Sequence, residues 1–301
     1  MNDHELAIAL AVRAGALLVE QRASLEAAGA WPEEIMDRGD KAAHDFLLAE
    51  LTLARPRDAV LSEEGHDDRA RLTAERVWII DPLDGTREYG EPGRSDWAVH
   101  VALWSAKHSA KHSGEHSGEH SGEHSGEHSG EGAVGVRAEA SGGLRNRSTD
   151  ASDPVPGGLI AGAVAMPALG TAYGTGPDAV ASGRSGRFRP RLVTSRFRHP
   201  YVAELIAEAL GADTFRMGSA GAKAMAVVTG EADIYAHAGG MYEWDSAAPI
   251  AVAAAAGLHV SRIDGTPLAY NQPDPWLPDL LICRPELAAR ALAAVHAAWH
   301  R

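Results

Sequence analysis

The chain of 301 residues has a single cysteine, Cys283. An intramolecular disulfide and a zinc site built from several thiolates are therefore excluded. Long apolar runs are also missing, because no stretch reaches the roughly 18 apolar residues that a transmembrane helix needs. The apolar segment 6–19 is interrupted by Arg13 and follows no basic segment, so it does not resemble a secretion signal. We therefore expect a cytoplasmic protein without a membrane partner.

Positive charge is scarce as well. Lys and Arg total 28 against 41 Asp and Glu, which gives a formal net charge of -13. This balance excludes a non-specific binder of nucleic-acid polymers, since that class needs a basic surface. An acidic protein can still bind small anions if bound cations supply local positive charge. The 45% of hydrophobic and 23% of charged residues are typical of a globular chain with a sizeable core.

Residues 105–158 differ from the rest of the chain in composition. SAKH occurs twice and SGEH four times before the repeat ends at Gly132, and a stretch rich in Gly, Ser and Pro follows. Such a segment buries too little apolar surface to offset its ordering entropy. The flanking runs 97–104 and 159–166 are strand-like. We interpret the segment as a low-complexity insert that lengthens the connection of a β-hairpin.

The repeat also carries six histidines at four-residue spacing, from His108 to His128. Imidazoles favour Zn, Ni or Cu, so a rival hypothesis is a non-catalytic metal-binding protein that uses the repeat. A helix would place these histidines along one face. The glycine in most of the repeats, however, disfavours a helix by about 1 kcal/mol each. A disordered and functionally neutral expansion is the favoured interpretation.

Periodicity divides the remaining chain into two parts. The first part, residues 1–188, is predicted to be α+β, with helices at 6–28 and 41–53 and short strands at 59–61 and 77–80. The second part, residues 189–301, alternates in a way that indicates a layered α/β arrangement. Its predicted elements are a strand at 191–195, helices at 200–210 and 219–229, a strand at 232–238, a helix at 246–256, a hairpin at 259–270, a strand at 280–283 and a helix from Pro285.

The most informative run is V-W-I-I-D-P-L-D-G-T, residues 77–86. A buried strand brings Asp81 to its carboxyl end, where sites of α/β proteins commonly lie. Asp81 and Asp84 can face one cation across the turn, joined by the carbonyl of Leu83. Gly85 allows close approach of a ligand, and Thr86 adds a hydroxyl. The alternative is an ordinary turn with two capping aspartates.

Two further segments supply carboxylates. S-E-E places Glu63 after a short strand and 18 residues before Asp81. E-W-D-S-A-A, residues 243–248, places Asp245 where a helix begins. Taken alone, Glu63 could be a solvated loop acid and Asp245 a helix N-cap.

Together these three segments resemble the inositol monophosphatase superfamily of magnesium-dependent, lithium-sensitive phosphatases. The resemblance extends from about residue 6 to residue 301 outside the insert, and it implies an αβαβα sandwich. It also implies two or three Mg²⁺ ions, for which oxygen ligands are suitable. By this likeness Glu63, Asp81 and the Leu83 carbonyl hold the first ion, and Asp81, Asp84 and Asp245 hold the second.

The resemblance also implies the residues that act on water. Asp40, 23 residues before Glu63, matches an upstream aspartate that pairs with the threonine matched by Thr86. In the family this pair orients the attacking water, so Asp40, Thr86 and Glu63 form the expected catalytic set. The mechanism would be metal-assisted phosphoryl transfer to water. Asp40 could at the same time be the N-cap of a helix that begins at Lys41.

The G-S-A-G-A-K run that ends at Lys223 resembles the CysQ-type 3′(2′),5′-bisphosphate nucleotidase branch. This branch hydrolyses 3′-phosphoadenosine 5′-phosphate to AMP in sulfur assimilation; inositol 1-phosphate and fructose 1,6-bisphosphate are the alternative substrates. Lys223 and Arg196 could meet a second phosphate, or be a solvated helix lysine and a surface ion pair. A homodimer is a further possibility. The expected substrate contacts are Gly85, Thr86, Ser195, Arg196, Ser219 and Lys223.

Overall fold

Two five-stranded sheets and seven α-helices make up the part of the chain that the structure describes. This computed structural model describes residues 1–108, 157–177, 179, 181–182, 188–197 and 200–299. The interpretations of the low-complexity insert and of its histidine repeat concern mainly residues 109–156, which lie outside the described residues.

The first sheet has the strand order β1-β2-β3-β4-β5. Its strands are β1 (Ala59–Ser62), β2 (Arg76–Asp84), β3 (Ala98–Ser105), β4 (Gly158–Met166) and β5 (Thr171–Gly174). β1 runs parallel to β2, and the other neighbours are antiparallel. The antiparallel pairing of β3 with β4 confirms the two strands that were predicted on either side of the insert.

The second sheet has the order β7-β6-β8-β10-β9. Its strands are β6 (Arg191–Ser195), β7 (Asp213–Met217), β8 (Ile234–Tyr242), β9 (His259–Ser261) and β10 (Trp276–Cys283). β6 is parallel to both β7 and β8, whereas β10 pairs antiparallel with β8 and β9. The first sheet thus ends before β6, and the change of sheet falls between Gly174 and Arg191. The division of the chain at residue 188 stays a prediction.

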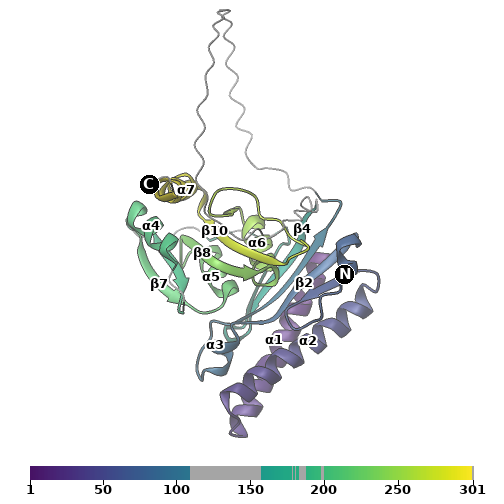
Figure 1. Cartoon of the computed structure of the whole chain (residues 1–301). Helices are drawn as coiled ribbons and strands as arrows, with labels where there is room; N and C mark the ends of the chain where they lie inside the picture. The colour runs from purple at the N-terminus through teal and green to yellow at the C-terminus, as the bar shows by residue number, and fades with distance from the viewer. Residues whose placement is uncertain (109–156, 178, 180, 183–187, 198–199, 300–301) are drawn as a thin grey trace, which may run out of the picture. The chain divides into compact units, whose positions relative to one another are not determined.

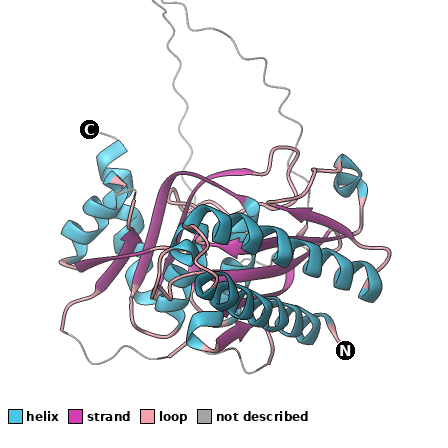
Figure 2. Ribbon diagram, turned by 90° about the horizontal axis from the view of Figure 1, so that it is seen from below, coloured by secondary structure: helices cyan, strands magenta, loops and turns pink. Residues whose placement is uncertain are grey.

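The helices form three layers around the two sheets (Figures 1 and 2). α1 (Asp3–Ala27) and α2 (Pro32–Ala54) cover the outer face of the first sheet, and α5 (Ala220–Val228) and α6 (Glu243–Ala255) lie between the sheets. α4 (Tyr201–Leu210) and α7 (Pro285–Trp299) pack on the far side of the second sheet. Three short helices, α3 (Thr86–Gly90), η1 (Arg69–Thr73) and η2 (Pro167–Leu169), complete the described elements. This order of layers is the predicted αβαβα sandwich.

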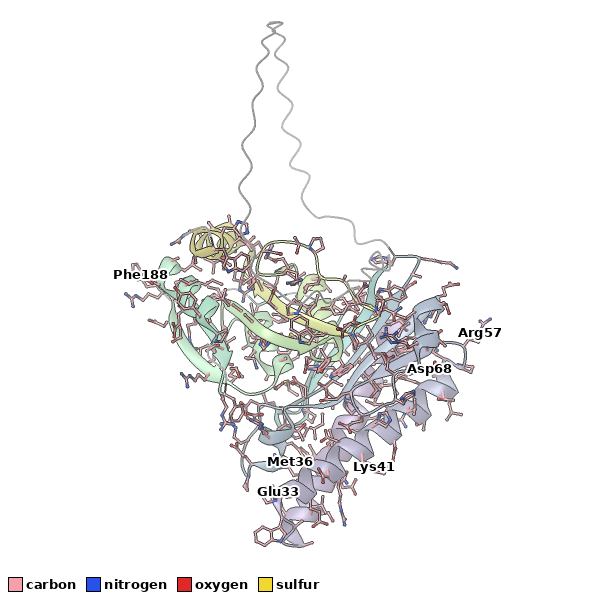
Figure 3. All side chains as sticks on the ribbon, in the orientation of Figure 1. Glu33, Met36, Lys41, Arg57, Asp68 and Phe188 are labelled. Atoms are coloured by element: carbon pink, nitrogen blue, oxygen red, sulfur yellow. The ribbon has the colours of Figure 1, made fainter. Side chains whose placement is uncertain are left out.

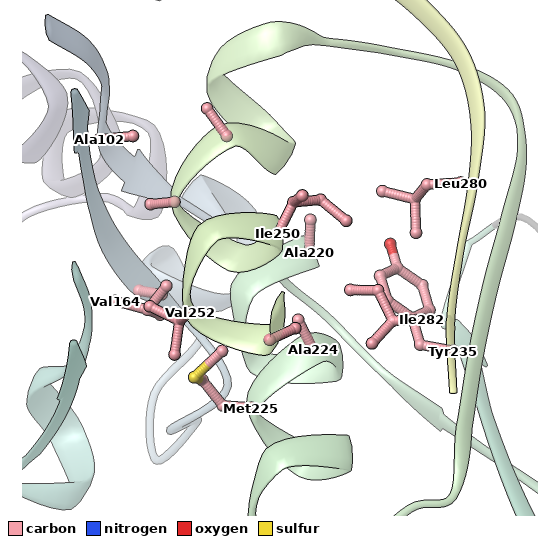
Figure 4. Close-up of a cluster of buried hydrophobic side chains, with 14 of the residues drawn as sticks. Ala102, Val164, Ala220, Ala224, Met225, Tyr235, Ile250, Val252, Leu280 and Ile282 are labelled. Carbon is pink, nitrogen blue, oxygen red and sulfur yellow. The ribbon is translucent and has the colours of Figure 1, made fainter. Parts of the chain in front are cut away.

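Strand β2 explains why the layers stack. Val77 and Ile79 belong to the core between the sheets, whereas Trp78 and Ile80 belong to the core under α1 and α2. A strand buried on both faces reads as a continuous apolar run, because its side chains alternate between two cores. Figure 4 shows the central core, where side chains of both sheets point toward α5 and α6. Burial on both faces fixes the position of the Asp residues at the end of β2.

Three expectations about local structure were wrong. Helix α2 begins at Pro32 rather than Lys41, since Pro suits a first helical turn, so Asp40 lies within the helix and is not its N-cap. Strand β7 was missed, because it is a short, largely exposed edge strand without an apolar pattern.

The predicted hairpin at 259–270 was the third. A turn does form at Asp264–Gly265, where the Arg262 N–H bonds to the carbonyl of Thr266. The chain after this turn forms no strand, however, and β9 pairs with β10 instead. Asp264 accepts hydrogen bonds from the N–H and the hydroxyl of Thr266, which closes the turn locally.

Among the described helices, none is long and apolar enough to cross a membrane.

We expect Gly162→Ala in β4 to destabilise the protein by about 1–3 kcal/mol, because a Cβ there would lie 2.8 Å from the Cβ of Ala251 in α6. Neither carbon can move without a shift of backbone. Gly176→Ala is the matched control, since nothing lies within 4 Å of a Cβ at that position. Urea unfolding of the two variants measures the difference. Equal stability of both would show that β4 and α6 are not in close contact.

Candidate metal centre

The candidate centre begins at the end of β2. A register shift between Asp81 and Asp84 interrupts the pairing of β2 with β3 at Pro82, which has no N–H for a ladder hydrogen bond. The strand is irregular here, and the Leu83 N–H donates a hydrogen bond to Oδ1 of Asp81 at 3.0 Å. Both carboxylates thereby point away from the strand ladder. Strand β2 continues to Asp84 and the turn comes at Gly85, so the alternative of a turn capped by both aspartates was wrong: only Asp81 accepts a backbone hydrogen bond within this segment.

Asp81 is the most deeply buried of these acids. It is 1% exposed, and its second oxygen, Oδ2, has no hydrogen-bond partner within the described part of the chain. Burial raises the pKa of the Asp81 carboxyl well above its usual range, and the charges of Glu63 and Asp84 add to the shift. An ionised carboxylate in this position needs a positive partner.

Asp84 has a different environment, because it faces the start of α5. Its oxygens accept hydrogen bonds from the N–H groups of Ala220 at 3.1 Å and Gly221 at 2.7 Å, and from the Ser219 hydroxyl. Burial alone would raise the pKa of Asp84, but the charges of His100 and Lys223 and these hydrogen bonds hold it well below its usual range. Asp84 therefore stays ionised.

Asp245 lies in the first turn of α6. Tyr242 is the N-cap of that helix, and its N–H bonds to Oδ2 of Asp245 at 2.6 Å, so the suggestion that Asp245 is the N-cap was wrong. Burial, and then the charge of Asp84, raises the pKa of Asp245 to about 6. Ligand atoms of Asp81, Asp84 and Asp245 all lie within 4.8 Å of one another. The structure thus brings together three of the predicted metal ligands.

Glu63 follows β1 and lies near this triad. Although part of its side chain reaches solvent, desolvation of the carboxyl and the charge of Asp245 raise the pKa of Glu63 to about 7. Asp40 lies nearby in α2, where burial and the charges of Glu64 and Glu63 raise the pKa of Asp40 to about 8. Both carboxyls therefore lie close to the negative charges of other carboxylates.

Thr86 connects two other expected residues. Its hydroxyl oxygen lies 3.1 Å from the Leu83 carbonyl and 3.5 Å from Oδ1 of Asp40. A hydroxyl has one proton, so the shorter contact is the better hydrogen bond. The contact with Leu83 holds that carbonyl in place, and a carbonyl oxygen has a second lone pair for another partner.

This set of oxygens is chemically suited to a hard divalent cation. Carboxylates and a carbonyl are the ligands that Mg²⁺ and similar ions prefer. The unpartnered Oδ2 of Asp81 and the raised pKa values of the neighbouring acids mark a concentration of negative charge that a cation would relieve. The acidic triad can therefore hold a metal ion.

A pocket of about 620 Å³ adjoins the triad, with Asp84 and Asp245 in its wall. Five of the six expected substrate contacts also line it, namely Gly85, Thr86, Ser195, Ser219 and Lys223. Aromatic side chains form much of the remaining wall, namely Phe197, Tyr235, Tyr242 and Trp276. The pocket thus combines acidic, hydroxyl and aromatic groups. A small polar ligand with an aromatic part fits this lining.

The two basic residues expected at a second phosphate lie differently. Lys223 is buried rather than solvated, and its Nζ donates to the carbonyls of Gly218 and Ser219 at 2.7 and 2.6 Å. Burial lowers the pKa of Lys223 to about 8. Arg196 is not part of the pocket wall and forms ion pairs with Glu88 and Glu91, which is the ion-pair alternative that its sequence left open.

Trp244, the residue before Asp245, stacks on Tyr242 with ring centroids 4.7 Å apart. Only Tyr242 of this pair lines the pocket. Trp244 therefore lies outside the pocket wall and packs against the ring of Tyr242.

Sequence reasoning missed His100, which is fully buried in β3. Its Nε2 lies 3.1 Å from Oδ2 of Asp84, and its Nδ1 lies 3.2 Å from the Trp244 carbonyl. A Cβ on Gly221 would lie 2.1 Å from the His100 ring, so glycine is required for α5 to approach. A lone polar residue in an otherwise apolar strand was the available signal. His100 connects the triad to α5 and α6.

Comparison with known proteins agrees with this geometry. The model of the inositol monophosphatase family matches residues 2–110 and 183–300. A 3′-phosphoadenosine 5′-phosphate phosphatase of Mycobacterium bovis is 45% identical over 290 residues, covering 95% of this chain and 90% of the relative. The Mycobacterium leprae protein of the same name is 41% identical over 301 residues, covering 99% and 95%.

Solved structures show the same fold at lower identity. An inositol monophosphatase II from Staphylococcus aureus superposes with a TM-score of 0.65 at 17% identity, covering 99% of this chain and 97% of that one. This likeness confirms the predicted fold. The family match and the two relatives extend over both sheets, and they include each segment that contributes to the triad. The chain belongs to the inositol monophosphatase family.

Proposed function

We propose that the protein is a divalent-metal-dependent phosphomonoesterase that hydrolyses 3′-phosphoadenosine 5′-phosphate to AMP and phosphate. The observation that carries this proposal is the triad of Asp81, Asp84 and Asp245, the first two of them buried, beside an aromatic-lined pocket. Two mycobacterial relatives that bear the name of this activity support the choice of substrate. A role in sulfur assimilation, a cytoplasmic location and a homodimer stay predictions from the sequence.

The residues that would hold Mg²⁺, as two or three ions, are Glu63, Asp81, Asp84, Asp245 and the carbonyl of Leu83. When bound, such ions lower the pKa of a water molecule and neutralise charge on the phosphoryl oxygens. The chain itself supplies the orientation. Oδ2 of Asp81 accepts no hydrogen bond from the described residues, and the Thr86 hydroxyl holds the Leu83 carbonyl in place. A cation could bind there without disturbing any hydrogen bond of these two oxygens.

Asp40 and Thr86 are proposed to position the attacking water. Their oxygens lie 3.5 Å apart, a separation at which one water can contact both groups. Asp40 would accept a proton from the water, and the Thr86 hydroxyl would fix its direction of approach. Gly85 and Ser219 line the adjacent pocket, where the phosphate ester is proposed to bind. Ser195 and Lys223 line the same pocket and stay proposed substrate contacts.

Asp81→Asn should separate catalysis from stability. We expect kcat to fall on the order of a thousandfold or more, because the amide is a much weaker ligand for a cation. The melting temperature in chelator should stay equal or rise, because the change removes a buried charge beside other carboxylates. Glu33→Gln is the matched control, since Glu33 lies in the first turn of α2 at the edge of the molecule (Figure 3). Full activity of Asp81→Asn in saturating Mg²⁺ would refute the assignment.

Stability should depend on pH in a direction set by the raised pKa values. Because Asp245, Glu63 and Asp40 have folded-state pKa values of about 6, 7 and 8, their ionisation is resisted in the fold. The contribution of these three carboxyls to the free energy of unfolding is fully present below their unfolded-state pKa values. It is lost as the pH rises through their folded-state pKa values. In chelator, the free energy of unfolding should therefore fall between about pH 4 and pH 8.

A divalent cation competes with protons for the same oxygens. The gain in melting temperature on adding Mg²⁺ should therefore be larger at about pH 8 than at about pH 5. Thermal unfolding at matched ionic strength measures both gains, and Asp81→Asn should reduce them. An equal gain at the two pH values would contradict the proposal that these carboxylates bind the cation.

A panel of phosphate esters tests the substrate. We expect kcat/KM for 3′-phosphoadenosine 5′-phosphate to exceed that for inositol 1-phosphate and fructose 1,6-bisphosphate by about tenfold or more. Phosphate release is measured with Mg²⁺ and with added Li⁺, which the family resemblance expects to inhibit. The Asp81→Asn protein is the control for contaminating phosphatase. A preference for inositol 1-phosphate would refute the nucleotide assignment and leave the metal-dependent phosphatase in place.

A further inference from the structure

Three basic side chains lie in or beside the pocket, and two of them are already engaged. Lys223 is 5% exposed, and its Nζ donates two short hydrogen bonds to backbone carbonyls. The guanidinium of Arg196 lies 2.9 Å from Glu88 and 3.1 Å from Glu91. Both positive charges are therefore largely satisfied within the protein. A ligand phosphate would have to compete with these partners.

Arg87 is the third, and its surroundings differ. It is exposed, it lines the pocket, and no carboxylate of the described residues lies within 4.0 Å of its nitrogens. Its guanidinium carbon lies 4.8 Å from the centre of the Phe197 ring, which also lines the pocket. Stacking on an aromatic face orients a guanidinium plane and leaves its N–H groups free to donate.

The position of Arg87 along the chain places it near the triad. It follows Thr86 directly and is three residues from Asp84, a separation of at most about 11 Å between the backbones. One small ligand can therefore contact both the metal centre and the Arg87 side chain. A guanidinium binds phosphate through two parallel hydrogen bonds, which gives affinity and also orientation.

We propose that Arg87 binds the phosphate that is not hydrolysed and thereby selects a nucleoside bisphosphate over a monophosphate. The inference rests on the proposed function and adds its specificity-determining residue. The hydrolysed phosphate lies at the carboxylates, and the second phosphate meets Arg87, whose guanidinium, unlike the Lys223 ammonium, donates no hydrogen bond to the described residues. A monophosphate has no second phosphate for Arg87 to bind. The free energy of the contact between Arg87 and that phosphate therefore adds to the preference for the bisphosphate.

Arg87→Met tests the assignment, because it removes the charge and keeps much of the aliphatic stem. We expect kcat/KM for 3′-phosphoadenosine 5′-phosphate to fall by about tenfold or more, mainly through KM. The value for adenosine 3′-monophosphate should change by less than about twofold. Arg87→Lys should lie between, since it keeps the charge without the bidentate geometry. Arg57→Met is the matched control, because Arg57 is exposed and points outward at the edge of the molecule (Figure 3).

Product inhibition gives a second readout that does not depend on turnover of the bisphosphate. In Arg87→Met the inhibition constant of adenosine 5′-monophosphate should rise by about tenfold, whereas that of inorganic phosphate should not change. An equal loss of kcat/KM for both substrates, or unchanged inhibition by adenosine 5′-monophosphate, would refute the role of Arg87. Either result would leave the proposed function in place. If the wild-type protein did not hydrolyse the bisphosphate, the proposed function would fail, and the inference with it.

Discussion

Asp81 lies fully buried beside Asp84, Asp245 and Glu63, and this crowding of carboxylates is the constraint on which the site depends. Repulsion between these four carboxylates disfavours the folded state, so other interactions in the fold must hold them together. Apolar packing on both faces of β2 holds Asp81 in position despite that cost. A cation that binds among these carboxylates reduces their repulsion, and this gain strengthens its binding.

The crowding is not uniform, and the difference has a chemical meaning. Asp84 receives hydrogen bonds from the start of α5 and lies near His100 and Lys223, so it is stabilised in its ionised form. Asp81 has no comparable donors for Oδ2 within the described residues. The fold thus neutralises one side of the triad with its own groups and leaves the other side able to bind a metal ion. The same partition explains why the Lys223 ammonium is buried at this point of α5 and bonded to backbone carbonyls, although the residue lines the pocket.

The local signals in the sequence were sufficient for the centre of the site and insufficient for its surroundings. The run that ends in Asp81 and Asp84 predicted a buried strand and a turn, since both follow from short-range pattern. Glu63 and Asp245 became part of one site only through the family resemblance, because no spacing rule joins residues so far apart in sequence. His100 and the burial of Lys223 depend on how α5 packs against β3, which no local pattern encodes. The start of α2 was mistaken because Asp40 suits a helix cap by residue type alone.

Helix α5 joins the two halves of the chemistry. Its first backbone N–H groups bind Asp84, and its cap residue Ser219 lines the pocket. The carboxylates come mainly from the first sheet and the elements beside it, whereas Tyr235, Tyr242 and Trp276 in the pocket wall come from the second. Trp276 of β10 can therefore change without moving the carboxylates at the end of β2, whereas Tyr242 also bonds Asp245. Such an arrangement lets part of the pocket wall vary while the carboxylates stay in place, although Arg87 follows β2 of the first sheet and Asp245 follows β8 of the second.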